Sequence, residues 1–163
     1  MNMRRARGIY VVEFAIVGLL LFIVLFGVLE VGRLLFTVNT LNESVRRGAR
    51  LATVCDIDDS EILRRAVFAG VDETTSTIIG GLDSGDLVLS YLDANGEPTT
   101  NFALIRFVQV VLQGFEMNLL IPVLGGSITL QTFRAVLPRE SLGRHAEGEQ
   151  ELDKPDFPGI TPC

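Results

Sequence analysis

Apolar residues fill the chain from Ile9 to Leu29, and Glu13 is the one charged residue among them. As an α-helix rising about 1.5 Å per residue, this run spans roughly 32 Å, which is enough to cross one bilayer core. A removable secretory signal has a shorter apolar region of about 7–15 residues, followed by a cleavage site of small residues. The residues that follow Leu29 offer no such site, so the run is predicted to remain as a membrane anchor.

The helical pattern continues beyond the apolar run as an amphipathic stripe. Apolar residues recur at spacings of three and four or their multiples, and charged or amide residues occupy the other side. No proline occurs before Pro98, so the pattern predicts one continuous helix over residues 9–54, with residues 9–29 in the membrane and the rest packed on a domain. Glycines within it mark either kinks or places where backbones approach closely. The apolar set is Val31, Leu34, Leu35, Val38, Leu41 and Leu51; the glycines are Gly18, Gly27, Gly32 and Gly48.

A second, shorter helix is predicted after Cys55, reaching about Gly70. Asp58, Asp59 or Ser60 would cap its exposed amide groups. The same acidic residues do not fit a calcium loop, since the glycine and the bidentate glutamate that such a loop requires are missing.

Strand-type composition follows a Thr-, Ser- and Gly-rich loop at residues 71–85. Asp93–Gly96 is a strong turn signal between the first two strands. The second strand is apolar on both sides, which indicates a central strand covered by the amphipathic half of the long helix. The apolar segment Phe115–Gly126 is either a flap over the core or an exposed patch for another subunit. The predicted strands are Leu87–Leu92, Phe102–Gln113 and Ile128–Leu137.

These patterns predict an α+β fold: a long N-terminal helix, transmembrane in its first half, a small antiparallel β-sheet domain and a second short helix. The acidic, proline-bearing C-terminal part is expected to be extended or disordered unless tethered. The expected segments are a basic leader at 1–8, the long helix at 9–54, an α+β domain at 55–137 and the acidic tail at 138–163.

The charge distribution predicts an orientation in the membrane. Arg4, Arg5 and Arg7 precede the apolar run, so the Lys/Arg bias of short flanking loops places the N-terminus in the cytoplasm and the remainder outside. Residues 1–50 carry a net charge of +4, and residues 51–163 carry −10. The acidic exported part argues against a nucleic acid partner, because phosphate binding requires clustered Lys and Arg.

The carboxylate of Glu13 is energetically unfavourable within an apolar segment of membrane length. An acidic side chain near the bilayer centre costs on the order of 2.5–3.5 kcal/mol, which makes it a candidate functional residue. If the chain were cut after Gly8, the new α-ammonium group of Ile9, on the same or a neighbouring subunit, would neutralise the carboxylate. The alternative is that Glu13 reaches the headgroups and is stabilised by the helix dipole.

Cys55 and Cys163 are the two cysteines, both on the side predicted to be exported. An oxidising compartment permits a disulfide between them, which would close a long loop. Two free thiols, or lipidation without the usual preceding motif, are the alternatives.

Catalytic and cofactor motifs are missing from the sequence. His145 is the single histidine and lies in the acidic tail, and no glycine pattern of a nucleophile elbow surrounds Ser141. The spacing suits neither zinc nor a phosphate-binding loop, so no enzyme activity, metal or cofactor is expected.

The sequence around Gly8 resembles the processing site of type IV prepilins and pseudopilins, in which a membrane peptidase cuts after the glycine and a glutamate occupies the fifth mature position. Gly8 and Ile9 would then flank the cut, and Glu13 would set the register between subunits. The same region is similar, more narrowly, to the TadE-like pseudopilins of tight-adherence (Flp-type) pilus systems. The residues that carry this likeness are Arg7–Ala15, Gly27–Leu34 and Arg47–Arg50, with fainter similarity at Ile121–Ser127 and Leu137–Glu140.

Two departures separate the chain from the major Flp pilins. Those pilins have Tyr after the glutamate where this chain has Phe14, and they are much shorter. The resemblance therefore implies a minor pseudopilin in the bacterial inner membrane. Its partners would be the prepilin peptidase, other pilins and pseudopilins, and the pilus assembly platform. Alternatives are a single-pass, membrane-tethered periplasmic binding module, a membrane-bound periplasmic enzyme and a type II secretion pseudopilin, whose usual first mature residue is Phe where this chain has Ile9.

Overall fold

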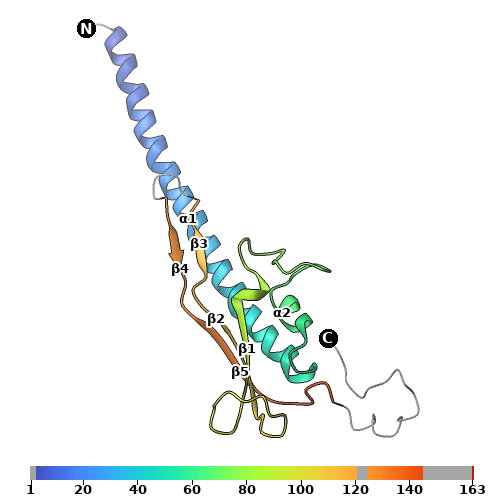
Figure 1. Ribbon diagram of the computed structural model, residues 1–163. Helices are drawn as coiled ribbons and strands as arrows, with labels where there is room; N and C mark the ends of the chain where they lie inside the picture. Colours follow the sequence, from blue (N-terminus) through green and yellow to red (C-terminus); the bar gives the residue numbers. More distant parts are fainter. Residues whose placement is uncertain (1–2, 121–124, 145–162) are drawn as a thin grey trace. The chain divides into compact units, whose positions relative to one another are not determined.

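The computed structural model describes residues 3–120, 125–144 and 163, with side chains from Ile9 onward. Within these ranges, one long helix, one short helix, a 3-10 turn and five strands make up an α+β fold, as the sequence predicts (Figure 1). The elements are α1 (Met3–Val54), α2 (Ser60–Ala66), η1 (Ser84–Asp86), β1 (Leu87–Leu92), β2 (Phe107–Leu112), β3 (Glu116–Asn118), β4 (Ser127–Thr129) and β5 (Phe133–Pro138).

Contacts between residues divide the chain into two units, described here one at a time. The first, the anchor unit, comprises Met1–Phe36 and Met117–Ile128. The second, the sheet unit, comprises Thr37–Glu116 and Thr129–Cys163.

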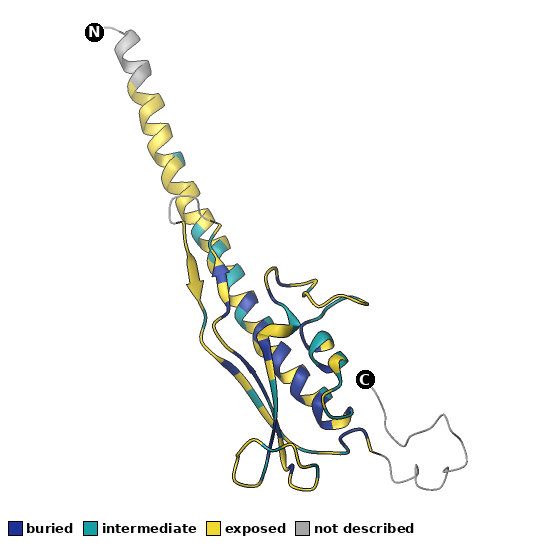
Figure 2. Cartoon of the chain, in the orientation of Figure 1, coloured by how far each residue is buried: buried dark blue, intermediate teal, exposed yellow. Residues whose placement is uncertain are grey.

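The anchor unit holds the apolar part of α1. Most of its apolar side chains are exposed, as the yellow part of α1 in Figure 2 shows. Strands β3 and β4 pair as a two-stranded sheet, and the Leu119 amide donates to the Gly126 carbonyl over 2.9 Å. Such a helix has no apolar partner in water, so it requires another apolar environment.

The sheet unit contains a three-stranded antiparallel sheet in the order β1-β2-β5. Val110 on β2 pairs with Leu89 on β1 and Ala135 on β5. Strand β2 is therefore the central strand, as its apolar composition indicates.

One face of this sheet packs against α1. Side chains spaced three or four residues apart along the helix are fully buried, which is the pattern of an amphipathic helix on a sheet. Gly48 lies at the closest approach: a Cβ there would be 3.1 Å from the Ala66 Cβ and 3.4 Å from a Val110 methyl group. This glycine therefore permits close packing of α1 against both α2 and β2. The fully buried helix side chains are Leu41, Ser44, Val45, Ala49 and Ala52.

The C-terminal end of α1 is closed by a distant segment of the chain. The Leu142 amide donates to the Thr53 carbonyl over 3.0 Å, and the Gly143 amide donates to the Val54 carbonyl over 2.9 Å. These carbonyls belong to the last turn of the helix, where no partner within the helix exists. Residues 139–144 thus belong to the sheet unit. The sequence predicted an extended or disordered tail unless it was tethered, and these two hydrogen bonds tether its first residues.

Two predicted strands are shorter than expected. The stretch before β2 forms a turn, since the Leu104 and Ile105 amides donate to the Asn101 carbonyl and the Ala103 amide donates to the Asn101 side chain. An Asx-type side chain competes in this way with strand pairing. The third predicted strand, Ile128–Leu137, is interrupted between β4 and β5. The helix, in turn, begins at Met3 rather than at Ile9.

Candidate functional site: the N-terminal helix and the bridge at its end

The N-terminal part of α1 is a regular, apolar helix with little cover. Among the described residues, α1 from Ile9 onward is the one helix long and apolar enough to cross a membrane. Phe14 is 79% exposed and Ile9 is 67% exposed. A helix that is apolar all round in this way suits a lipid environment or the interior of a helical assembly.

The sequence-predicted processing residues lie within this helix. Gly8, Ile9 and Glu13 fall in one uninterrupted helical stretch, and the Glu13 side chain is exposed. Among the side chains described from Ile9 onward, none forms an ion pair with Glu13. The basic residues Arg4, Arg5 and Arg7 are in the helix too, but their side chains lie outside the described part.

A charged pair that the sequence analysis did not single out lies where the apolar run ends. Arg33 Nη2 is 2.5 Å from Glu30 Oε1, at the helical spacing of three residues. Glu30 Oε2 accepts a hydrogen bond from the Leu120 amide over 3.3 Å, and Arg33 Nη2 donates to the Asn118 carbonyl. The Glu30 side chain is only 11% exposed. The pair therefore fixes the backbone of the segment after β3 on α1 within the anchor unit.

The opposite charges of Glu30 and Arg33 are visible in the sequence and could have been used to predict this pair. Their helical spacing predicts an ion pair, but nothing in the local sequence indicates that residues 118–120 would contact it. Such long-range partners become visible only in the fold.

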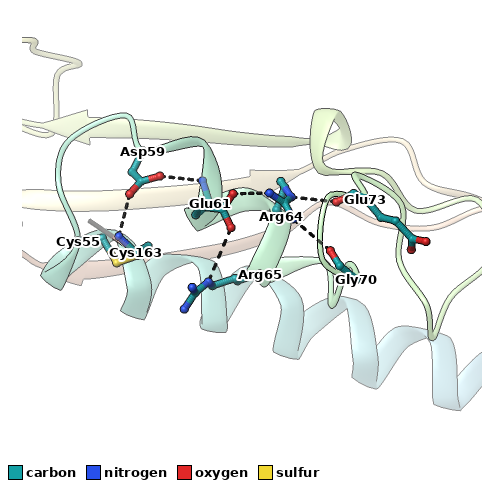
Figure 3. Close-up of polar contacts among 8 residues, drawn as sticks. All are labelled: Cys55, Asp59, Glu61, Arg64, Arg65, Gly70, Glu73 and Cys163. Carbon is teal, nitrogen blue, oxygen red and sulfur yellow. Dashed lines mark hydrogen bonds and ion pairs between the residues drawn. A yellow bond between two sulfur atoms is a disulfide. The ribbon is translucent and has the colours of Figure 1, made fainter. Parts of the chain in front are cut away.

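A disulfide joins Cys55 and Cys163 in the sheet unit, with their Cα atoms 5.4 Å apart. This separation lies inside the range of about 4.4–6.8 Å that the bond requires. The Asp59 carboxylate supports the bridge, because its Oδ2 accepts from the Cys163 amide over 2.8 Å while its Oδ1 accepts from the Glu61 amide over 2.9 Å (Figure 3). Asp59 thus caps α2 and holds Cys163 with one side chain.

Helix α2 is tied to the loop that follows it by Arg64. The Arg64 guanidinium donates to the carbonyls of Glu73 over 2.9 Å and Gly70 over 3.1 Å, and it pairs with Glu61 (Figure 3). Arg65 Nε lies 3.9 Å from the second Glu61 oxygen. Arg64 and Arg65 thus have their charge partner, Glu61, within α2 itself. We interpret these contacts as stabilising the local structure.

Burial and hydrogen bonds shift the pKa values of several titratable groups in the sheet unit. Burial raises the pKa of Tyr91, whose hydroxyl accepts from the Asp58 amide over 3.2 Å. Backbone amides of Glu97 and Asn95 lower the pKa of Asp93, and the Gly85 amide together with Thr74 lowers that of Asp83. Asp93 holds the turn after β1, and Asp83 caps η1.

No group of three His, Cys, Asp or Glu residues capable of holding a metal ion occurs in the described ranges. His145 lies outside those ranges.

Comparison with known proteins gives one match. The model of a family described as TadE-like protein matches residues 8–50. Searches among curated proteins and among solved structures found no match. The matched part begins at Gly8 and covers the exposed apolar stretch, the Glu30–Arg33 pair and most of the helix face that packs on the sheet. The similarity to TadE-like proteins therefore lies in the N-terminal helix of this chain, where the sequence resemblance was found.

Proposed function

We propose that this chain is a minor pseudopilin that assembles with a tight-adherence (Flp-type) pilus. The observation that carries the proposal is the TadE-like match, which begins at Gly8 and covers a helix with an exposed apolar surface. The family match indicates involvement in this pilus system, and α1 supplies the membrane anchor that such a subunit needs.

In the proposed mechanism, α1 holds the subunit in the inner membrane with its N-terminus in the cytoplasm and the sheet unit in the periplasm. A prepilin peptidase cuts after Gly8 and removes the leader arginines, which would otherwise resist extraction from the bilayer. The subunit then joins other pilins and pseudopilins at the assembly platform. A nucleic acid partner is not part of the proposal.

Glu13 sets the register between subunits in this scheme. Its carboxylate has no ion-pair partner among the described side chains, so a partner must come from elsewhere when the helix is surrounded by apolar groups. The α-ammonium group of Ile9 on a neighbouring subunit would fill that place. The Cys55–Cys163 bridge belongs to the exported, oxidising side in the same scheme.

The test is the intact mass of the protein purified from membranes of cells with and without the prepilin peptidase. We expect a mature chain beginning at Ile9 only where the peptidase is present, and a full-length chain for Gly8→Val under both conditions. Gly18→Ala is the matched control, because a Cβ at Gly18 meets nothing within 4 Å, and this variant should be cut normally.

A chain that keeps its leader in the presence of the peptidase would refute processing and favour a tethered binding module. Glu13→Gln should be processed like the natural chain but recovered with the other pilus subunits in much smaller amount. Normal recovery of that variant would refute the role of Glu13 in register.

A further inference from the structure

Strand β5 has a free edge in the sheet unit. Within the described sheet it pairs with β2 alone. The Arg139 amide donates to the Arg106 carbonyl over 2.9 Å, so 106 and 139 form a hydrogen-bonded pair that continues the register of β2 with β5. Because such pairs alternate along an antiparallel ladder, Arg134, Val136 and Pro138 direct their backbone polar groups away from β2.

Pro138 supports this assignment independently. Proline lacks an amide hydrogen and is tolerated in a sheet where that group would face the open edge. The outward groups are therefore the N–H and C=O of Arg134 and Val136 and the carbonyl of Pro138. Neither of those two amides has a backbone acceptor in the described ranges.

A groove lies between this edge and α1. Three of the six residues that line it are arginines, and none is acidic. All three arginines are exposed, and within the described part of the chain none of them forms an ion pair. The lining residues are Arg46, Arg50, Arg134, Ala135, Val136 and Leu137.

Charged residues along an edge strand commonly serve to prevent uncontrolled pairing. That role accounts for Arg134, which belongs to the strand, but not for the two arginines on the helix. Arg46 and Arg50 are four residues apart on α1, a rise of about 6 Å. Alternate residues of an extended strand are separated by a similar distance, about 6.6 Å. A strand laid along β5 with acidic side chains at alternate positions would therefore meet both helix arginines.

We propose that the β5 edge is a docking site for an extended segment of a partner chain that carries carboxylates on alternate residues. The segment adds to the sheet as a fourth strand. Its backbone pairs with Arg134 and Val136, and its acidic side chains form charge-assisted hydrogen bonds with Arg46 and Arg50. This inference concerns the sheet unit and does not rest on the proposed processing of the N-terminus.

The test uses the full chain in detergent at about 0.15 M salt, where long-range attraction between exposed charges is screened. The probe is a fluorescent peptide with the sequence of residues 146–154, because Glu147, Glu149, Glu151 and Asp153 place carboxylates on alternate residues. Its binding is followed by anisotropy. A peptide of the same composition with its four acidic residues contiguous is the control for charge alone.

We expect the alternating peptide to bind at least tenfold more tightly than the contiguous one. Arg46→Gln with Arg50→Gln should weaken its binding at least tenfold, while Arg106→Gln, outside the groove, should not change it. Hydrogen exchange at the amides of Arg134 and Val136 should slow when the peptide binds.

Equal binding of the two peptides would overturn the proposal, since it would show attraction by charge without strand addition. Absence of binding, or exchange at Arg134 and Val136 that the peptide does not alter, would overturn it as well.

Discussion

At the scale of single residues, Gly143 shows how one backbone position closes the main helix. Its φ of +76° is in the left-handed region that favours glycine. A Cβ at this position would lie 2.7 Å from the Asp56 backbone nitrogen, which is too close for any side chain. The neighbouring Leu142 also has a positive φ, 49°, and is fully buried. The strained pair is maintained because both amides reach the last carbonyls of α1.

We expect Gly143→Ala to destabilise the sheet unit by about 2 kcal/mol or more, through left-handed strain and displacement of residues 142–143 from the helix end. Hydrogen exchange should quicken at the amides of Leu142 and Gly143. Gly81→Ala is the control for strain alone, because Gly81 also has a positive φ but meets nothing within 4 Å. Equal losses for the two variants would contradict the role assigned to the contact with Asp56.

Asp93 makes the turn after β1 sensitive to acid. Backbone amides of Glu97 and Asn95 donate to its carboxylate over 3.0 and 2.7 Å, and they hold the pKa of Asp93 below its ordinary value of 3.8. A lowered pKa in the folded state means that the charged form contributes stability above pH 3.8. That contribution is lost as the pH falls through the folded-state pKa.

We therefore expect the Asp93 carboxyl carbon to titrate below pH 3.8 in an NMR experiment, and the Glu97 amide shift to follow it. In Asp93→Asn the part of the Glu97 amide shift that follows Asp93 should disappear. An Asp93 that titrates at 3.8 or above would contradict the importance of these amide bonds.

At the scale of elements, the Glu30–Arg33 pair joins α1 to the segment after β3. Removing Arg33 would leave the Glu30 carboxylate, largely buried, without its ion partner. Since an unsatisfied buried polar group costs about 1–3 kcal/mol, we expect Arg33→Ala to loosen residues 118–120 by about that amount.

The measurement is hydrogen exchange at the Leu120 amide in the full chain in detergent. Arg33→Ala and Glu30→Ala should each accelerate it, and the double variant should accelerate it by less than the sum of the two, because the groups act as one pair. Strict additivity would show that the two side chains work independently.

The elements differ in how far the sequence could predict them. Periodicity predicts α1 well because the 46 residues from Ile9 to Val54 carry the signal. The sequence offered Asp58, Asp59 or Ser60 as the cap of α2, and Asp59 is the residue that caps it. The apolar composition of β2 indicated a central strand. The turn at Asn101 was missed, since residues 102–106 look like a strand and only the Asn101 side chain competes with it. The cap on α1 by Leu142 and Gly143 is a long-range contact that local patterns do not contain.

At the scale of the whole molecule, one covalent bond closes much of the chain. Cys55 and Cys163 are 108 residues apart, and a cross-link over such a loop stabilises by about 4–5 kcal/mol in the chain-entropy account. We expect Cys55→Ser to lower the free energy of unfolding of the sheet unit by roughly that amount, measured by denaturant titration and circular dichroism.

Cys163→Ser and the double variant should lose the same amount as Cys55→Ser, since each removes the same bond. A double variant no less stable than the natural chain would show that the bridge is dispensable.

The N-terminal processing motif and this bridge could both be proposed from the sequence, because each depends on a few rare residues. The hydrogen bonds from residues 142 and 143 to the end of α1 could not.

The separation of the two cysteines also has a kinetic consequence. At synthesis rates of about 5–20 residues per second, Cys163 is made about 5–20 s after Cys55. During that interval the nascent chain holds a lone thiol that has no intramolecular partner. The end of α1 can fold in this time, but the disulfide can form only after Cys163 has been made. An enzyme that oxidises the Cys55 thiol earlier must therefore reduce it again before the native bond can form.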